Sequence, residues 1–146
     1  MIFTHEFTTP RNLYDKLIRE NEQLDMVVSG DTILDFVCTA VCLHEWLKNA
    51  PQNETTAQFV NKVSRDPNIK ICKDIFACKA TFCVKIDDPA LEEGSLFEHI
   101  RVPENYDLLA YTNQTKKFTL TIATKEVDIF KFKEEIALLY AIYFKV

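Results

Sequence analysis

The segment from Asp31 to Leu47 constrains the fold of this chain more than any other part of the sequence. It reads D-T-I-L-D-F-V-C-T-A-V-C-L-H-E-W-L, and its apolar residues cover most of the circumference of a helix. A helix that is apolar on nearly every side belongs inside a core. The sequence therefore predicts a central helix that follows the break at Ser29-Gly30 and ends near Asn49.

The same helix carries two polar side chains, Asp35 and Thr39, toward neighbours that we expect to be packed. Because buried polar groups need hydrogen-bond partners or a cleft, we expect a structural hydrogen-bond network at these residues. The alternative is a small-molecule pocket with an unknown ligand, lined by Asp35, Thr39, Glu45, Trp46 and Lys79. Alternatively, Trp46 is a core residue, because aromatic residues of apolar helices usually lie in the core.

Capping residues mark three further helices in the first half of the chain. Thr9 before Pro10 and Asp66 before Pro67 are pairs of an N-cap and a first helical residue, and Asn53 is the third cap. The spacing after each cap predicts an apolar face that packs inward. After Asn53 and Asp66 the inward residues are predicted to be Phe59, Val60, Val63, Ile69, Cys72, Ile75 and Phe76.

The apolar period changes from 3.6 to 2 residues after Lys79, which indicates strands. Short connections between them, including a tight turn at 112–115, favour an antiparallel meander with one long loop from Asp87 to Gly94. The predicted strands are 81–86, 96–102, 106–111 and 117–124.

Helical spacing returns after Val127 and predicts a closing helix with Phe132, Ile136, Leu139 and Tyr143 on one face. Residues 127–133 also alternate with a period of 2, which leaves the first turn open between strand and helix. The fold class is therefore α+β in a single domain, residues 1–146. It consists of an N-terminal helical bundle around the buried central helix, an antiparallel β-meander and the closing C-terminal helix.

Composition excludes several classes of function. The net charge of −5 and the pI near 5.2 disfavour a nucleic-acid surface, and the densest basic group, Lys62, Lys70, Lys73 and Lys79, is too sparse to reverse that. Two glycines cannot build a P-loop or a Rossmann phosphate turn. The chain also lacks the H-E-x-x-H, G-x-S-x-G and C-x-x-C motifs, so the sequence predicts no catalytic residue.

The five cysteines form no pattern typical of disulfide-linked secreted domains. We expect reduced thiols, a cytoplasmic location and no bound cofactor. Cys38, Cys42 and His44 resemble a zinc-ligand set in residue type only. His44 lies about 160° around the helix from Cys42, so the three side chains do not converge, and we expect no metal site. Asp35 interrupts the longest apolar run, so we expect no membrane span.

Two motifs carry a resemblance to a known group. The first lies in Asp31–Leu47, and the second consists of Ile71–Ile75 and Lys79, about thirty residues later. They resemble the T-A-x-H-L-x-D-W helix and the later C-R-D-I…K-H-F element of an uncharacterised group of small bacterial and phage-associated proteins. The residues that match in kind are Thr39, Ala40, Leu43, Trp46, Asp74, Lys79 and Phe82.

This chain departs from the group where its members have histidines. Cys42 and a residue near Ala80 stand in those places, and Glu45 replaces an aspartate. The resemblance covers roughly residues 1–85 and implies a shared fold. If the histidines act chemically in the relatives, it also implies that this chain has lost or altered that chemistry.

These observations favour a non-catalytic cytoplasmic binding or interaction protein of phage or mobile-element origin. The 11 phenylalanines, five tyrosines and one tryptophan favour self-association as a homodimer, through a sheet edge or through the C-terminal helix that carries Tyr140 and Tyr143. The pocket protein described above is one alternative. The enzyme alternative is a degenerate HEPN-type nuclease, which is disfavoured because no arginine is followed by a histidine four to six residues later.

Overall fold

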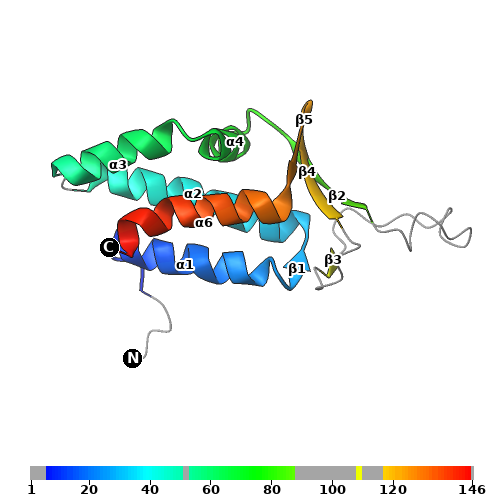
Figure 1. Ribbon diagram of the computed structural model, residues 1–146, viewed down its shortest axis with the longest axis horizontal. Helices are drawn as coiled ribbons and strands as arrows, with labels where there is room; N and C mark the ends of the chain where they lie inside the picture. The colour runs from blue at the N-terminus through cyan, green and yellow to red at the C-terminus, as the bar shows by residue number, and fades with distance from the viewer. Residues whose placement is uncertain (1–5, 51–52, 88–107, 110–116, 146) are drawn as a thin grey trace, which may run out of the picture.

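The computed structural model describes residues 6–50, 53–87, 108–109 and 117–145. It has five helices in this part of the chain, arranged as a bundle with a small antiparallel sheet at one end (Figure 1). The α+β class, the N-terminal helices and the C-terminal helix predicted from the sequence are confirmed. The helices are α1 (Pro10–Gln23), α2 (Gly30–Asn49), α3 (Glu54–Ser64), α4 (Pro67–Phe76) and α6 (Ile129–Phe144).

Local chemistry explains where these helices begin. The Ser29 hydroxyl accepts a hydrogen bond from the Thr32 backbone N–H at 3.1 Å, which caps α2. Asn53 and Asp66 cap α3 and α4 through their side-chain oxygens, as the sequence predicts. Asp128 caps α6 by accepting from the backbone N–H of Lys131 at 3.0 Å, so α6 begins later than the apolar spacing from Val127 indicates.

The larger sheet is antiparallel, with the order β2 (Phe82–Asp87), β4 (Lys117–Ile122) and β5 (Lys125–Asp128). Its register places Leu120 opposite both Val84 and Val127. Alternate side chains of β2 and β4 therefore face the bundle, and Phe118, Leu120 and Ile122 are buried. Val127 belongs to β5, which resolves the open choice at 127–133 as strand first and helix from Ile129.

The second sheet corrects one prediction. Its two strands are β1 (Val27–Val28) and β3 (Leu108–Leu109), which pair antiparallel. The predicted strand 106–111 is therefore not a member of the meander in the part that the structure describes. The predicted strand 96–102 and the turn 112–115 lie outside the described residues.

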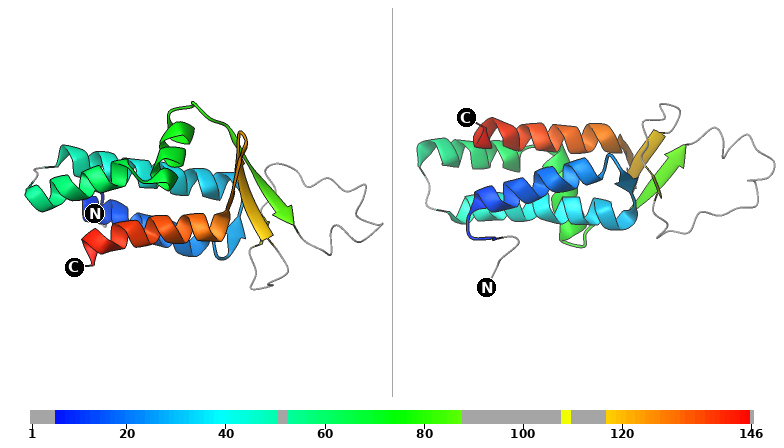
Figure 2. Two further views of the ribbon diagram at one scale, coloured as in Figure 1. Left: turned by 45° about the horizontal axis from the view of Figure 1, so that its top comes forward. Right: turned by 90° about the horizontal axis from the view of Figure 1, so that it is seen from below.

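Helix α2 lies at the centre of the bundle and contacts α1, α3 and α4. Its core contacts with α6 include a hydrogen bond from the Tyr140 hydroxyl to the Ala40 carbonyl at 2.8 Å and an edge-to-face pair between Phe36 and Phe132, with ring centroids 6.5 Å apart. The two views in Figure 2 show α1 and α6, which are far apart in the sequence, lying side by side along the bundle. The prediction of a buried central helix is confirmed.

Two expectations about individual side chains are wrong. Phe76, predicted to point inward, is 48% exposed because it is the last residue of α4, where the chain turns away toward β2. Asp35, predicted to meet packed neighbours, is exposed on the outer side of α2. Periodicity places Asp35 correctly on a polar strip of the helix, but it does not tell which strip lacks a neighbouring element.

Candidate functional site

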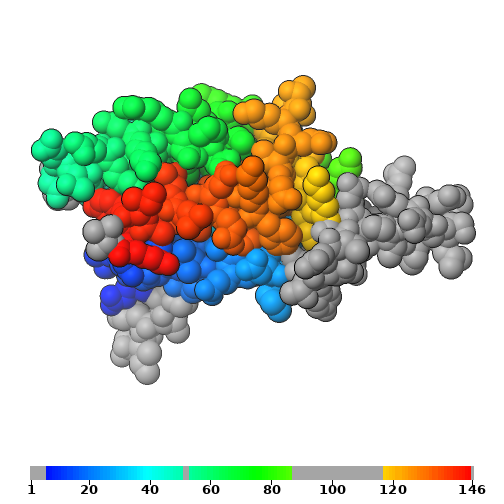
Figure 3. Space-filling view, viewed as in Figure 1, coloured from blue at the N-terminus to red at the C-terminus, as the bar shows by residue number. Residues whose placement is uncertain are grey.

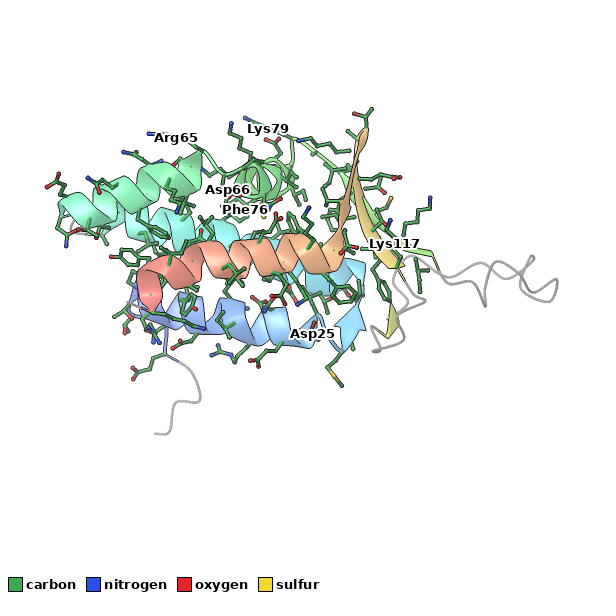
Figure 4. All side chains as sticks on the ribbon, in the orientation of Figure 1. Asp25, Arg65, Asp66, Phe76, Lys79 and Lys117 are labelled. Carbon is green, nitrogen blue, oxygen red and sulfur yellow. The ribbon has the colours of Figure 1, made fainter. Side chains whose placement is uncertain are left out.

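The five residues of the predicted pocket are in different environments. Thr39 is buried, and its hydroxyl donates to the Asp35 carbonyl at 3.0 Å, so the helix itself satisfies it. Trp46 is 36% exposed and Glu45 is half-buried on the same helix. Lys79 is exposed beyond the end of α4, where Figure 4 shows it directed away from the bundle.

Spacing puts Asp35, Thr39 and Trp46 along one strip of α2, whereas Lys79 comes from the connection between α4 and β2. None of the five predicted pocket residues lines either of the two depressions described below. The Thr39 hydroxyl is thus paired within α2 itself, and the Asp35 carboxylate is exposed and has no part in a buried network.

Among the large apolar side chains that are exposed in the described part of the chain, Leu138 and Ile142 on α6 are the one pair that lies a single helical turn apart. Leu138 and Ile142, four residues apart, are 63% and 55% exposed, and Ala141 between them is partly exposed. We call Leu138, Ala141 and Ile142 the α6 ridge. Figure 3 shows α6 crossing this face of the molecule between α3 and α4 on one side and α1 on the other. The ridge is therefore on an open surface at Leu138, while Ile142 also borders a hollow between α3 and α6.

The opposite face of α6 holds the ridge in place. Ile136 and Tyr140 are fully buried, and Leu139 is 7% exposed. Burial raises the pKa of Tyr140, whose hydroxyl donates to the Ala40 carbonyl. Because the buried face is anchored in this way, the exposed apolar residues cannot be covered by a simple rotation of the helix. Tyr140, predicted at a self-association surface, is in the core.

A hollow of about 340 Å³ adjoins the ridge, and we call it the α3–α6 hollow. Its floor includes a hydrogen bond at 2.9 Å between the hydroxyls of Thr56 and Tyr143. Tyr143 stacks on Phe59 with ring centroids 4.7 Å apart, which fixes that wall. The hollow is lined by Asn53, Thr55, Thr56, Ile142 and Tyr143.

A second depression, of about 320 Å³, lies at the other end of α6, and we call it the acidic cleft. Asn68 donates to the Glu135 carboxylate at 2.7 Å, and Lys131 lies 4.0 Å from the same carboxylate. Three carboxylates against one ammonium group give the cleft a negative potential. The cleft is lined by Asn68, Glu126, Val127, Asp128, Lys131, Phe132 and Glu135.

His44 and Ser64 form a buried polar pair, with His44 Nε2 at 3.0 Å from Ser64 Oγ. The serine hydroxyl already donates to the Val60 carbonyl at 2.9 Å, so the imidazole must donate its Nε2 proton to the serine. A serine nucleophile needs the opposite arrangement, in which the serine donates to the histidine. His44 is also only 1% exposed, so this pair is not placed to act on a substrate.

Lys133 forms the most extensive polar cluster between α1 and α6. Its side chain is buried, and Nζ lies 3.0 Å from Asp25, 3.1 Å from Glu134 and 3.2 Å from Asn21. The nitrogen also lies 5.7 Å from the centre of the Phe130 ring. Every donor of the ammonium group has an acceptor, so this cluster links the two helices and leaves no group free for chemistry.

The described part of the chain contains no group of three or more histidine, cysteine, aspartate or glutamate side chains that is arranged to hold a metal ion. All five cysteines are free thiols. Among the helices that the structure describes, none is long and apolar enough to cross a membrane.

Comparisons with protein-family models, with curated proteins and with solved structures find no match.

The ridge is not evident from the sequence, because Leu138 and Ile142 lie in the run I-A-L-L-Y-A-I-Y-F, which is typical of a core helix. The sequence does carry one indication of exposed apolar residues: this run is apolar on every side. If such a run lies on the outside of a small bundle, some of its apolar side chains must remain on the surface.

Proposed function

We propose that this protein is a non-catalytic cytoplasmic interaction protein that associates with a second copy of itself through the outer face of α6. The observation that carries the proposal is the exposure of Leu138 and Ile142 on a helix whose other face is anchored in the core. Exposed apolar side chains at adjacent turns of one helix favour association, because pairing removes them from water.

The surroundings of the ridge support a partner that is a second copy. Two-fold dimers use the same patch on both subunits, so the patch must be complementary to itself. The α6 ridge projects and the α3–α6 hollow recedes on the same face, and Ile142 belongs to both. A projecting element and a recess side by side meet this requirement.

Size sets the expected affinity. A helix of 16 residues is about 24 Å long, so the ridge alone offers much less than the roughly 800 Å² per subunit of a standard interface. Contacts along the hollow and the acidic cleft must add to it. We therefore expect a reversible dimer with a dissociation constant in the micromolar range.

The test is light scattering on the double variant Leu138→Gln/Ile142→Gln beside a matched control. Leu34→Gln/Met26→Gln removes two other exposed apolar side chains, which are 42% and 67% exposed and belong to α2 and to the connection after α1. We expect the α6 variant to stay monomeric at 100 μM or so, where the parent and the control form dimers. Equal association by all three proteins would contradict the proposed surface.

A further inference from the structure

The residues of α6 that share its outer face have a charge order that specifies how two copies meet. From the N-terminal end, Lys131, Glu134 and Glu135 precede Leu138, Ala141 and Ile142, and Lys145 follows as the C-cap residue. All seven lie within the same exposed sector of the helix by spacing. The sector is thus acidic before the apolar ridge and basic after it.

This order is symmetric about Tyr140. Leu138 and Ile142 lie two residues before and two after it, and Glu135 and Lys145 lie five before and five after it. Two copies of α6 that cross antiparallel at the level of Tyr140 therefore place Leu138 opposite Ile142 of the other copy, and Glu135 opposite its Lys145. A two-fold axis creates each of these contacts twice.

A parallel arrangement gives a different result. A parallel two-fold pair places each residue against its own counterpart, so Glu135 meets Glu135 and Lys145 meets Lys145. Like charges that are held together disfavour association, and opposite charges favour it. The charges of α6 thus select the antiparallel arrangement.

The acidic cleft strengthens this selection. Glu135 lines the cleft together with Glu126 and Asp128, and Lys131 is the one cation in its lining. The Lys145 ammonium group of a second, antiparallel copy approaches this end of α6, where the surplus of carboxylates attracts it. At the other end, Leu138 of the second copy lies opposite Ile142 and beside the α3–α6 hollow, which has room for an aliphatic side chain.

We infer that two copies of this chain pair through antiparallel α6 helices, with Glu135 of each copy facing Lys145 of the other across the apolar ridge. This inference rests on the proposed self-association and adds its arrangement. Both charged residues are exposed, so each ion pair contributes modestly and is screened by salt.

Charge reversal tests the arrangement, with dissociation constants measured by analytical ultracentrifugation at low salt. Lys145→Glu and Glu135→Lys each turn two attractive contacts into two repulsive ones, and we expect either variant to weaken association by about tenfold. The double variant Glu135→Lys/Lys145→Glu restores opposite charges in every contact of the antiparallel dimer, and we expect association within about twofold of the parent. In a parallel pair, by contrast, each residue meets its own counterpart. Lys145→Glu and the double variant then only replace one repulsive like-charge contact with another, so neither variant should change the dissociation constant much.

The outcomes separate the arrangement from the proposed function. Weaker association of both single variants, together with recovery in the double variant, supports the antiparallel pair. A dimer that needs Leu138 and Ile142 but whose double charge variant stays as weak as the single variants overturns the arrangement and leaves the α6 surface standing. Glu135→Lys also removes the hydrogen bond from Asn68, so thermal unfolding of each variant checks that the fold is intact. A parent protein that is monomeric at every concentration overturns both proposals.

Discussion

Replacing Lys133 tests what holds α1 against α6. The side chain of Lys133 is 1% exposed, while those of its partners Asp25 and Glu134 are 58% and 57% exposed. Removing a buried charge is costly when it leaves another charge buried without a partner, at about 3–5 kcal/mol. Here both carboxylates remain in water after the substitution, so that cost does not arise.

The aliphatic stem of Lys133 is therefore expected to matter more than its charge. Lys133→Met keeps a stem of similar length and removes the desolvation cost of the ammonium group, and we expect a change of less than about 1 kcal/mol in the free energy of unfolding. Lys133→Ala removes most of the stem and leaves a cavity between α1 and α6, which costs about 2–4 kcal/mol by analogy with other buried truncations.

Urea denaturation of the two variants beside the parent measures both changes. The expected result is a large loss for Lys133→Ala and near-parent stability for Lys133→Met. If Lys133→Met loses more than about 2 kcal/mol and matches Lys133→Ala, the ion pairs to Asp25 and Glu134 stabilise the fold, and the argument from their exposure is wrong.

Three further predictions concern single side chains. Burial, and then the nearby charge of Lys73, lowers the pKa of His44, so the unfolded chain binds a proton at this histidine more readily than the folded chain does. The free energy of unfolding, measured by urea denaturation between pH 7.5 and 5, should therefore decline as the pH falls below about 6.5. The variant His44→Gln should show a smaller decline. Cys78 has a φ of 61° after the end of α4, where the Lys79 N–H donates to the Asp74 carbonyl at 2.8 Å in a Schellman motif. Because glycine adopts a positive φ without strain, Cys78→Gly should stabilise the protein by about 0.5–1 kcal/mol in thermal unfolding. A loss of stability would contradict the role of Cys78 as the left-handed residue of this motif. Asp35→Asn should change the free energy of unfolding in urea by less than about 0.5 kcal/mol, because the carboxylate is exposed. A loss above about 1 kcal/mol would indicate that Asp35 does take part in the hydrogen-bond network predicted from the sequence.

The elements that could be predicted from the sequence are those fixed by local chemistry. Asn53 and Asp66 indicate where helices begin, because their side chains accept hydrogen bonds from backbone N–H groups of the first turn. The apolar spacing of α2 identifies a central helix because a solvent-exposed helix could not tolerate so many apolar residues. Strands β2 and β4 alternate clearly and face one core, so their period is visible without a partner.

Features that depend on distant partners could not be predicted. Leu108–Leu109 pairs with Val27–Val28, far away in the sequence, and neither two-residue segment carries a pattern that specifies the other. The exposure of Asp35 depends on which side of α2 lacks a neighbouring helix. The α6 ridge has the composition of a core, and only the packing of α6 on one side of the bundle exposes Leu138 and Ile142.

Sedimentation equilibrium of the unmodified protein over a range from about 1 to 200 μM shows whether α6 pairs two copies, because self-association makes the average mass depend on concentration. We expect a mass that rises from 17.0 kDa toward twice that value. We also expect added salt to shift the rise to higher concentration, since ion pairs between exposed residues contribute to the contact. A mass of 17.0 kDa at every concentration would contradict self-association through α6.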